Sequence, residues 1–141
     1  LRRRAGTENI AAVAGFAALV SEKIIDIKHL RDRLESSLEA VTVFGEGASR
    51  LPNTTCFALA GASAEALLIN LDLEGIAVSS GSACSSGKVA SSHVLQAMGV
   101  SPDLARGALR ISLGWNTTEE DIDRFIAAWR SIIARRNTRA A

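Results

Sequence analysis

The sequence predicts an α/β (α+β) domain, with a small mixed or antiparallel sheet of about three to four strands that is covered by helices and preceded by a long N-terminal helix. Three observations predict this fold. The length of 141 residues suits one domain, or a domain with an appendage. Helical and strand-like segments follow one another in the order α-β-β-α-β-α-β-α. Some connections between strands are short, which favours antiparallel pairing.

The first predicted element is a helix over residues 8–40. Apolar residues recur there at every third or fourth position, as in one very long helix or two helices in line. The first half is apolar on nearly all sides, whereas the second half is rich in charged residues. The first half therefore needs packing partners on several sides.

The next elements are short and bounded by turn residues. Strands are expected over residues 41–45 and 54–60, with Pro52-Asn53 as the turn before the second strand. Ser63 can cap a helix that runs to residue 74 and is closed by Gly75. A third strand is expected over residues 76–79.

The C-terminal part supplies the remaining helices and strand. Ser91 or Ser92 opens a short helix that ends at Gly99, a second short helix starts at Ser101-Pro102, and a fourth strand covers residues 108–113. In the final helix Thr117 and Glu120 form the expected capping box. Its buried stripe is predicted to consist of Ile122, Phe125, Ile126, Trp129, Ile132 and Ile133.

Composition excludes several classes of function. Sixteen basic and fifteen acidic residues give a net charge of +1, so no overall attraction to nucleic acid or to an acidic membrane is expected. The most apolar stretch, residues 10–20, is shorter than the roughly twenty residues that span a bilayer. The two cysteines form no disulfide framework, and no metal-ligand spacing is present. A reducing compartment, the cytoplasm, fits best.

Cys84 is the first candidate for chemistry. It lies in a run of small residues, Ser79-Ser80-Gly81-Ser82-Ala83-Cys84-Ser85-Ser86-Gly87. Such a segment buries little and allows a close approach to a ligand, so we expect an accessible thiol on a loop. The alternative is a surface loop with an incidental thiol. Cys56, within the second strand, is expected to be buried and inert.

Arg110 is the second candidate. It lies within the fourth strand, where Ser112 shares its face and Leu109, Ile111 and Leu113 share the other. The alternation fits a solvated arginine on an open sheet face as well as an anion ligand. A guanidinium on a rigid strand is well suited to bind a carboxylate through two parallel hydrogen bonds.

Several segments resemble the C-terminal third of cysteine desulfurases, pyridoxal-phosphate enzymes of the class V aminotransferase superfamily that serve nitrogenase and iron-sulfur assembly. The resemblance covers almost the whole chain in order. It is carried by Arg2-Arg3-Arg4-Ala5-Gly6-Thr7-Glu8-Asn9, Leu51-Pro52-Asn53-Thr54, Gly81-Ser82-Ala83-Cys84-Ser85-Ser86-Gly87, Ser92-His93-Val94-Leu95, Met98-Gly99, Arg110-Ile111-Ser112-Leu113-Gly114 and Thr117-Thr118-Glu119-Glu120-Asp121-Ile122.

The resemblance implies a role for three residues. Cys84 would be the nucleophile that takes sulfur from L-cysteine, becoming a persulfide and leaving alanine. Arg110 would hold the substrate carboxylate. Thr7 would reach the cofactor phosphate of the other subunit in a homodimer. The persulfide would pass to a sulfur acceptor or iron-sulfur scaffold protein.

One departure from the family limits what this chain does alone. The family binds its cofactor through a lysine in a large domain that precedes this region, and Lys23, Lys28 and Lys88 do not match that lysine motif. The sequence also opens without Met, so we expect a fragment of a longer protein that is inactive alone. By resemblance, residues 1–40 form a connecting helix packed on the missing large domain, and residues 41–141 form the small domain.

Other interpretations stay open. The parent protein could be another class V enzyme, such as a selenocysteine lyase or an aminotransferase. The chain could also be a cofactor-free module that relays sulfur or binds a partner. His29 and His93 are interpreted as structural, at a solvated helix position and at a helix start, although His93 follows the cysteine loop.

Overall fold

The computed structural model describes residues 8–21, 26–80 and 92–140. In chain order these residues form α1 (Ile10–Ser21), α2 (Lys28–Ser36), β1 (Val41–Val43), β2 (Thr54–Leu59), α3 (Ala64–Leu73), β3 (Ser79–Ser80), α4 (His93–Ala97), α5 (Pro102–Ala105), β4 (Ala108–Ser112) and α6 (Glu119–Ala140). The strands form one 4-stranded sheet in the order β1-β2-β4-β3, with every neighbouring pair antiparallel. The predicted fold class is confirmed.

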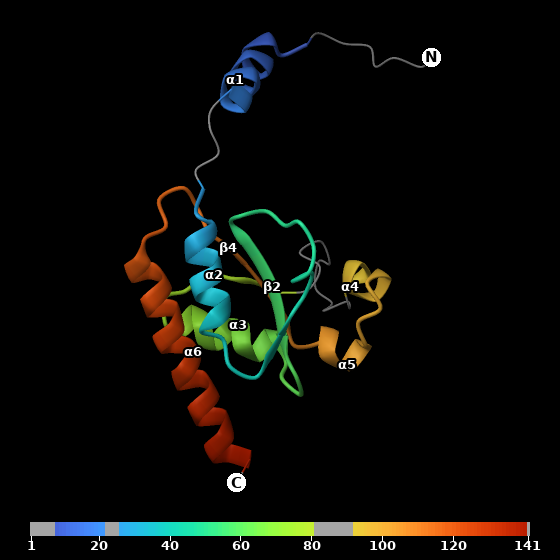
Figure 1. Ribbon diagram of the computed structural model, residues 1–141, viewed down its shortest axis with the longest axis vertical. Helices are drawn as coiled ribbons and strands as arrows, with labels where there is room; N and C mark the ends of the chain where they lie inside the picture. The colour runs from blue at the N-terminus through green and yellow to red at the C-terminus, as the bar shows by residue number, and fades with distance from the viewer. Residues whose placement is uncertain (1–7, 22–25, 81–91, 141) are drawn as a thin grey trace.

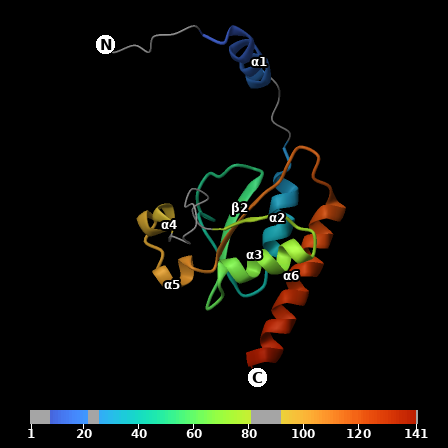
Figure 2. The ribbon, with the colours of Figure 1, turned by 180° about the vertical axis from the view of Figure 1, so that it is seen from behind.

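Helices cover the sheet unequally on its two faces (Figures 1 and 2). On one face Phe57 and Leu109 enter the main core, together with Leu34 from α2, Leu71 from α3 and Trp129 from α6. The side chains alternate along the strands, so the intervening residues of β2 and β4 face the other way. This alternation makes the second face a separate surface.

The second face is only partly covered. Ala58 and Ala108 pack there with Leu95 of α4, Ala105 of α5 and the buried Phe44. This smaller cluster covers the end of the face at which β4 begins. Further along β4 the residues on this face are exposed.

The prediction of one continuous helix over residues 8–40 is wrong, and the structure has the alternative, two helices. Asp26 and Ile27, which precede α2, are not helical. The Asp26 carboxylate accepts a hydrogen bond from the Lys28 N–H at 3.0 Å, and this N–H has no acceptor within its own helix. Ile27 is buried in the main core. The helix therefore restarts where its apolar side chains meet the sheet.

Helix α1 keeps the predicted apolar circumference. Its large side chains are strongly exposed, with Ile10 at 78%, Phe16 at 69% and Leu19 at 67%. Figure 1 shows this helix apart from the rest of the fold. No helix among the described residues is both long enough and apolar enough to cross a membrane.

The limits of the third strand differ from those expected. The third strand was expected over residues 76–79 but is formed by Ser79–Ser80. Ile76 donates its N–H to Leu71 O at 2.9 Å, which closes α3 instead of extending the sheet. Ile76 and Val78 pack against the main core without joining a strand.

The capping box of the last helix is also displaced. Thr118 and Asp121 form it: the Asp121 carboxylate accepts from Thr118 N at 2.9 Å, and Thr118 Oγ1 accepts from Asp121 N at 3.2 Å. Thr117 instead accepts a hydrogen bond from Gly114 N at 2.9 Å and closes the preceding turn. The predicted Thr117 and Glu120 pair is therefore wrong by one residue.

Candidate active site

Arg110 lies on β4, an inner strand of the sheet, and its side chain is on the face opposite the main core. Its neighbours in the strand, Leu109 and Ile111, are buried in that core. Arg110 itself is exposed. An inner strand of the sheet thus holds an exposed guanidinium.

Small neutral residues flank Arg110 on both sides. Cys56 of β2 is its cross-strand partner on one side, and Ser79 of β3 is its partner on the other. Directly opposed residues in antiparallel strands present their side chains on the same face. The row Cys56-Arg110-Ser79 thus places the guanidinium between a thiol and a hydroxyl, with neither carboxylate nor large side chain beside it in register.

Among the described residues, Arg110 has no acidic partner. Within the described part of the chain, no hydrogen bond or ion pair joins its guanidinium to another residue. By contrast, Arg31, Arg33 and Arg50 each contact a carboxylate. An exposed arginine without an acid partner is available to an anion from outside, and a carboxylate is the best geometric match.

Cys56 is half-buried, not buried as expected. Its thiol packs against the smaller apolar cluster on the Arg110 face. Burial raises the pKa of this thiol, and the nearby Arg110 charge opposes the shift. The thiol is therefore neutral near neutral pH and does not compete as an anion for the guanidinium.

Cys84 and Thr7 lie outside the described residues, so the structure does not place either side chain. Ser80 is the last residue of β3 and pairs with Leu109, the residue next to Arg110. In the sequence, Cys84 follows Ser80 by four residues.

The two histidines lie at helix positions on the surface. His93 is the first residue of α4, with Ser92 as its N-cap, as predicted. His29 is exposed on α2, and its Nε2 lies 3.9 Å from the Glu119 carboxylate. Within the described ranges, no group of three or more His, Cys, Asp or Glu side chains could hold a metal ion.

Cys56 and Ser79 flank Arg110 in the sheet, and the sequence alone does not predict that they do. The signal was present in part, since the alternation along residues 54–60 places Cys56 on one defined face. The register that pairs it with Arg110 was missing. Register depends on contacts between segments far apart in the chain, and a single sequence does not contain it.

Comparisons with known proteins agree with the resemblance. Residues 1–125 match the family model for class-V aminotransferases. The chain is 42% identical to "Cysteine desulfurase NifS" of Azotobacter vinelandii, over 94% of this chain and 36% of that protein. It is 37% identical to "Cysteine desulfurase IscS" of Dictyoglomus turgidum, over 96% of this chain and 37% of that protein. The chain thus spans about a third of the length of these curated relatives.

Solved structures agree as well. The fold is similar to the X-ray structure of a NifS-like protein from Rickettsia africae, with a TM-score of 0.75, 40% identity, and coverage of 93% of this chain and 36% of that one. A second solved structure, described as a NifS-like protein, has a TM-score of 0.72 at 30% identity.

Proposed function

Because the chain belongs to the class-V aminotransferase family, we propose that it is the C-terminal part of a cysteine desulfurase. The carrying observation is the exposed Arg110, flanked by the neutral Cys56 and Ser79, on the strand next to the one that leads to Cys84. Arg110 binds the carboxylate of L-cysteine. Cys84 takes the sulfur of that cysteine.

The atoms and electrons of the sulfur transfer balance between L-cysteine and the Cys84 thiol alone. The Cys84 thiolate attacks the substrate sulfur, the carbon-sulfur bond of the substrate breaks, and a sulfur-sulfur bond forms. The electron pair of the broken bond goes to the substrate carbon, which takes one thiol proton and becomes the methyl group of alanine. The other product is a Cys84 persulfide, which keeps the second proton. A sulfur acceptor, such as an iron-sulfur scaffold protein, then takes the terminal sulfur.

Pyridoxal phosphate is the cofactor that the family implies, and it makes the carbon-sulfur bond of an amino acid labile. The described residues do not fit a complete site for it. Lys28 contacts Asp32 on α2, which packs on the face of the sheet opposite Arg110. In our proposal the chain supplies the substrate clamp and the sulfur-accepting thiol, and another part of the enzyme supplies the lysine that binds the cofactor.

Assembly and location follow from the same proposal. Thr7 contacts the cofactor phosphate of the other subunit in a homodimer, and α1 packs on the large domain of the enzyme, where its apolar side chains are covered. Residues 41–141 then form the small domain. The sulfur transfer needs Cys84 as a free thiol, and thiols are kept reduced in the cytoplasm, so the cytoplasm is the proposed compartment.

The test uses the full-length enzyme that carries this sequence, with pyridoxal phosphate, L-cysteine and a dithiol reductant. Alanine and sulfide are quantified together. We expect Cys84→Ser to abolish both products and Arg110→Lys to raise the KM for cysteine by tenfold or more, since an ammonium does not reproduce two parallel hydrogen bonds, each charge-assisted bond contributing about 1.5–3 kcal/mol.

Three outcomes would contradict the proposal: full activity of Cys84→Ser, an unchanged KM for Arg110→Lys, or catalytic turnover by the 141-residue chain alone. The matched control is Arg106→Lys. Arg106 is an exposed arginine that pairs with Asp103 and lies outside the Arg110 row. It should leave KM unchanged.

A further inference from the structure

We propose that the cavity between α3 and α6 is a second binding site, which takes an acidic peptide segment with an aliphatic anchor side chain. The cavity has a volume of about 370 Å³ and is open to solvent on one side. It lies on the face of the sheet that α3 and α6 cover, whereas Arg110 lies on the other face. The proposal therefore does not depend on the desulfurase activity.

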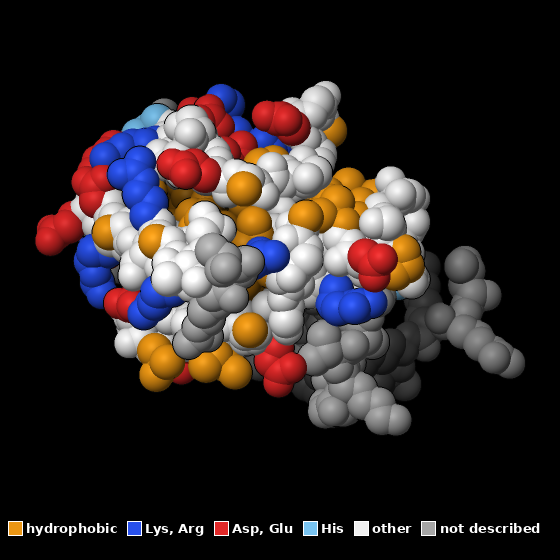
Figure 3. Space-filling view, turned by 90° about the horizontal axis from the view of Figure 1, so that it is seen from below, with side chains coloured by type: hydrophobic (Ala, Val, Ile, Leu, Met, Phe, Trp, Pro, Cys, Tyr) orange, Lys and Arg blue, Asp and Glu red, His pale blue; other side chains and the backbone are white. Residues whose placement is uncertain are grey.

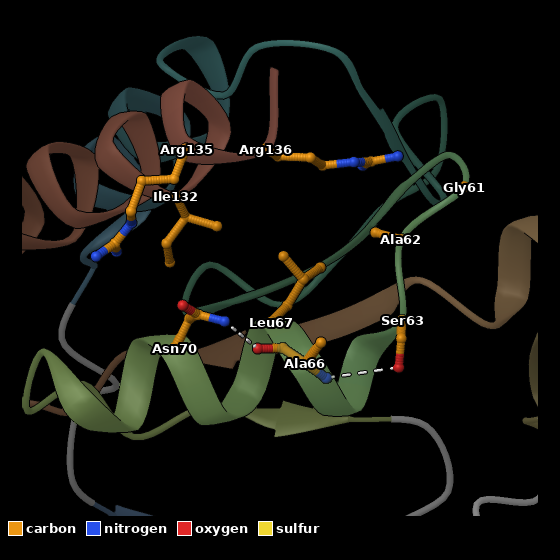
Figure 4. Close-up of a pocket in the computed structure, with 9 residues that line it drawn as sticks. All are labelled: Gly61, Ala62, Ser63, Ala66, Leu67, Asn70, Ile132, Arg135 and Arg136. Carbon is orange, nitrogen blue, oxygen red and sulfur yellow. Dashed lines mark hydrogen bonds between the residues drawn. The ribbon is translucent and has the colours of Figure 1, made fainter. Parts of the chain in front are cut away.

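The floor of the cavity is apolar. Leu67 of α3 and Ile132 of α6 point toward one another across it (Figure 4). Both belong to the main core, with exposures of 4% and 5%. Ala62 and Ala66 add small side chains to the wall, which leaves room above the floor. A branched aliphatic side chain from a partner would rest on Leu67 and Ile132, and the area removed from water would be mainly that of the partner's side chain, because these two residues are already buried.

The rim of the cavity is positively charged. Arg135 and Arg136 line it, and none of the described residues that line it is acidic. Each guanidinium has five N–H donors. Arg136 gives one N–H to Ala60 O at 2.9 Å, and Arg135 gives one to the Glu74 carboxylate at 3.3 Å. Donors therefore remain on both arginines for a carboxylate of a ligand.

Gly61 allows Arg136 to take this position. Its φ is +66°, a backbone conformation that residues other than glycine rarely adopt. A Cβ at this position would lie 3.1 Å from Arg136 Nη2. The glycine thus leaves room for the guanidinium, and Figure 4 shows the Arg136 side chain extending from α6 toward Gly61.

Charge complementarity selects the occupant. Figure 3 shows that charges of both signs are interspersed over the end of the molecule viewed from below. The cavity differs from that surface because its only charged lining residues, within the described chain, are the two arginines. An apolar floor with a basic rim matches a ligand that combines an aliphatic side chain with carboxylates. A segment longer than one residue would extend through the open side.

The test measures binding of a fluorescein-labelled peptide, Asp-Glu-Leu-Leu-Glu-Asp, to the chain by fluorescence anisotropy. Ala66→Glu places a carboxylate inside the cavity, and Ile69→Glu places the same charge on the same helix outside it, where Ile69 is 51% exposed. We expect saturable binding that Ala66→Glu weakens by about tenfold or more, and that Ile69→Glu changes by less than about twofold.

Two peptide controls separate the contributions of charge and apolar contact. Lysines in place of the four acidic residues should abolish binding, and alanines in place of the two leucines should weaken it. A second pair of variants guards against loss of folding: Arg136→Gln should weaken binding, whereas Arg130→Gln, on an exposed part of the same helix, should not. Circular dichroism verifies that each variant is folded.

The proposal is overturned by any of three results. These are no saturable binding up to about 1 mM peptide, equal binding of the lysine peptide, or equal losses for the cavity variants and their matched controls.

Discussion

Trp129 offers a quantitative test of how the core supports the sheet. Its indole is 1% exposed, packs edge to face on Phe57 at 5.3 Å between ring centroids, and stacks on Phe125 at 6.3 Å. Its Nε1–H is buried, and no hydrogen-bond acceptor reaches it in the described part of the chain. The residue therefore combines large favourable packing with one unfavourable buried polar group.

Two substitutions separate these contributions. Trp129→Ala removes the ring and leaves a cavity, which is expected to lower the free energy of unfolding by about 3–5 kcal/mol. Trp129→Phe keeps a ring against Phe57 and loses about 1–2 kcal/mol of packing. It also removes the unpaired N–H, whose burial costs about 1–3 kcal/mol. The two effects oppose one another, so the stability of Trp129→Phe should lie between about 1 kcal/mol below and about 2 kcal/mol above that of the wild type.

The assay is urea unfolding followed by far-ultraviolet circular dichroism, with the m-value compared among variants. Trp115→Phe is the matched control, because Trp115 is 79% exposed and its replacement should change stability by less than about 0.5 kcal/mol. If Trp129→Phe costs as much as Trp129→Ala, the reasoning about the unpaired N–H is refuted.

Three further predictions follow. Iodoacetamide should label Cys84 before Cys56, whose thiol pKa is raised by burial; faster labelling of Cys56, read by peptide mass, would contradict the assignment. The chain alone should self-associate at micromolar concentration through the exposed side chains of α1, since burying about four large side chains yields roughly 6–12 kcal/mol before ordering costs. Phe16→Asp should weaken this association in sedimentation equilibrium, and a monomeric wild-type chain would refute the prediction. Burial raises the pKa of Glu35, but its hydrogen bonds and charge interaction with Arg50 outweigh this and hold the pKa below the ordinary value of 4.5. The Glu35–Arg50 pair therefore stabilises the fold at pH values above the unfolded pKa of Glu35, and this contribution is lost as the pH falls through the lower folded pKa. Glu35→Gln should flatten the dependence of the unfolding free energy on pH in that range, and an unchanged dependence would disprove the contribution of the pair.

The sequence predicted element types better than element limits. Caps made by side chains close in the chain were found, as with Ser63, Ser92 and Ser101, each of which accepts a hydrogen bond from the first turn of its helix. The capping box was displaced because Thr117 and Thr118 are both suitable, and only the turn at Gly114 decides which one caps.

Long-range contacts account for the remaining differences. Arg31 belongs to the charged second half of the predicted long helix, yet it is only 5% exposed. Its guanidinium donates to Leu51 O at 2.7 Å, a residue far along the chain, and to the neighbouring Asp32. Such hydrogen-bond partners offset the cost of burying the arginine charge, but a sequence pattern does not reveal them. The same holds for the pairing of Cys56 with Arg110.

The strand order has a consequence for synthesis of the protein. Among the described strands, β4 is the last in the chain but lies between β2 and β3, and it is the strand that pairs with β3. While a ribosome is still translating the region before residue 108, β2 therefore has an open edge and β3 lacks this partner. The sheet closes only when β4 inserts between them, so Arg110 arrives on the strand that completes the sheet. A nascent chain stalled before this point would expose strand edges, which bind chaperones or pair with other chains and aggregate.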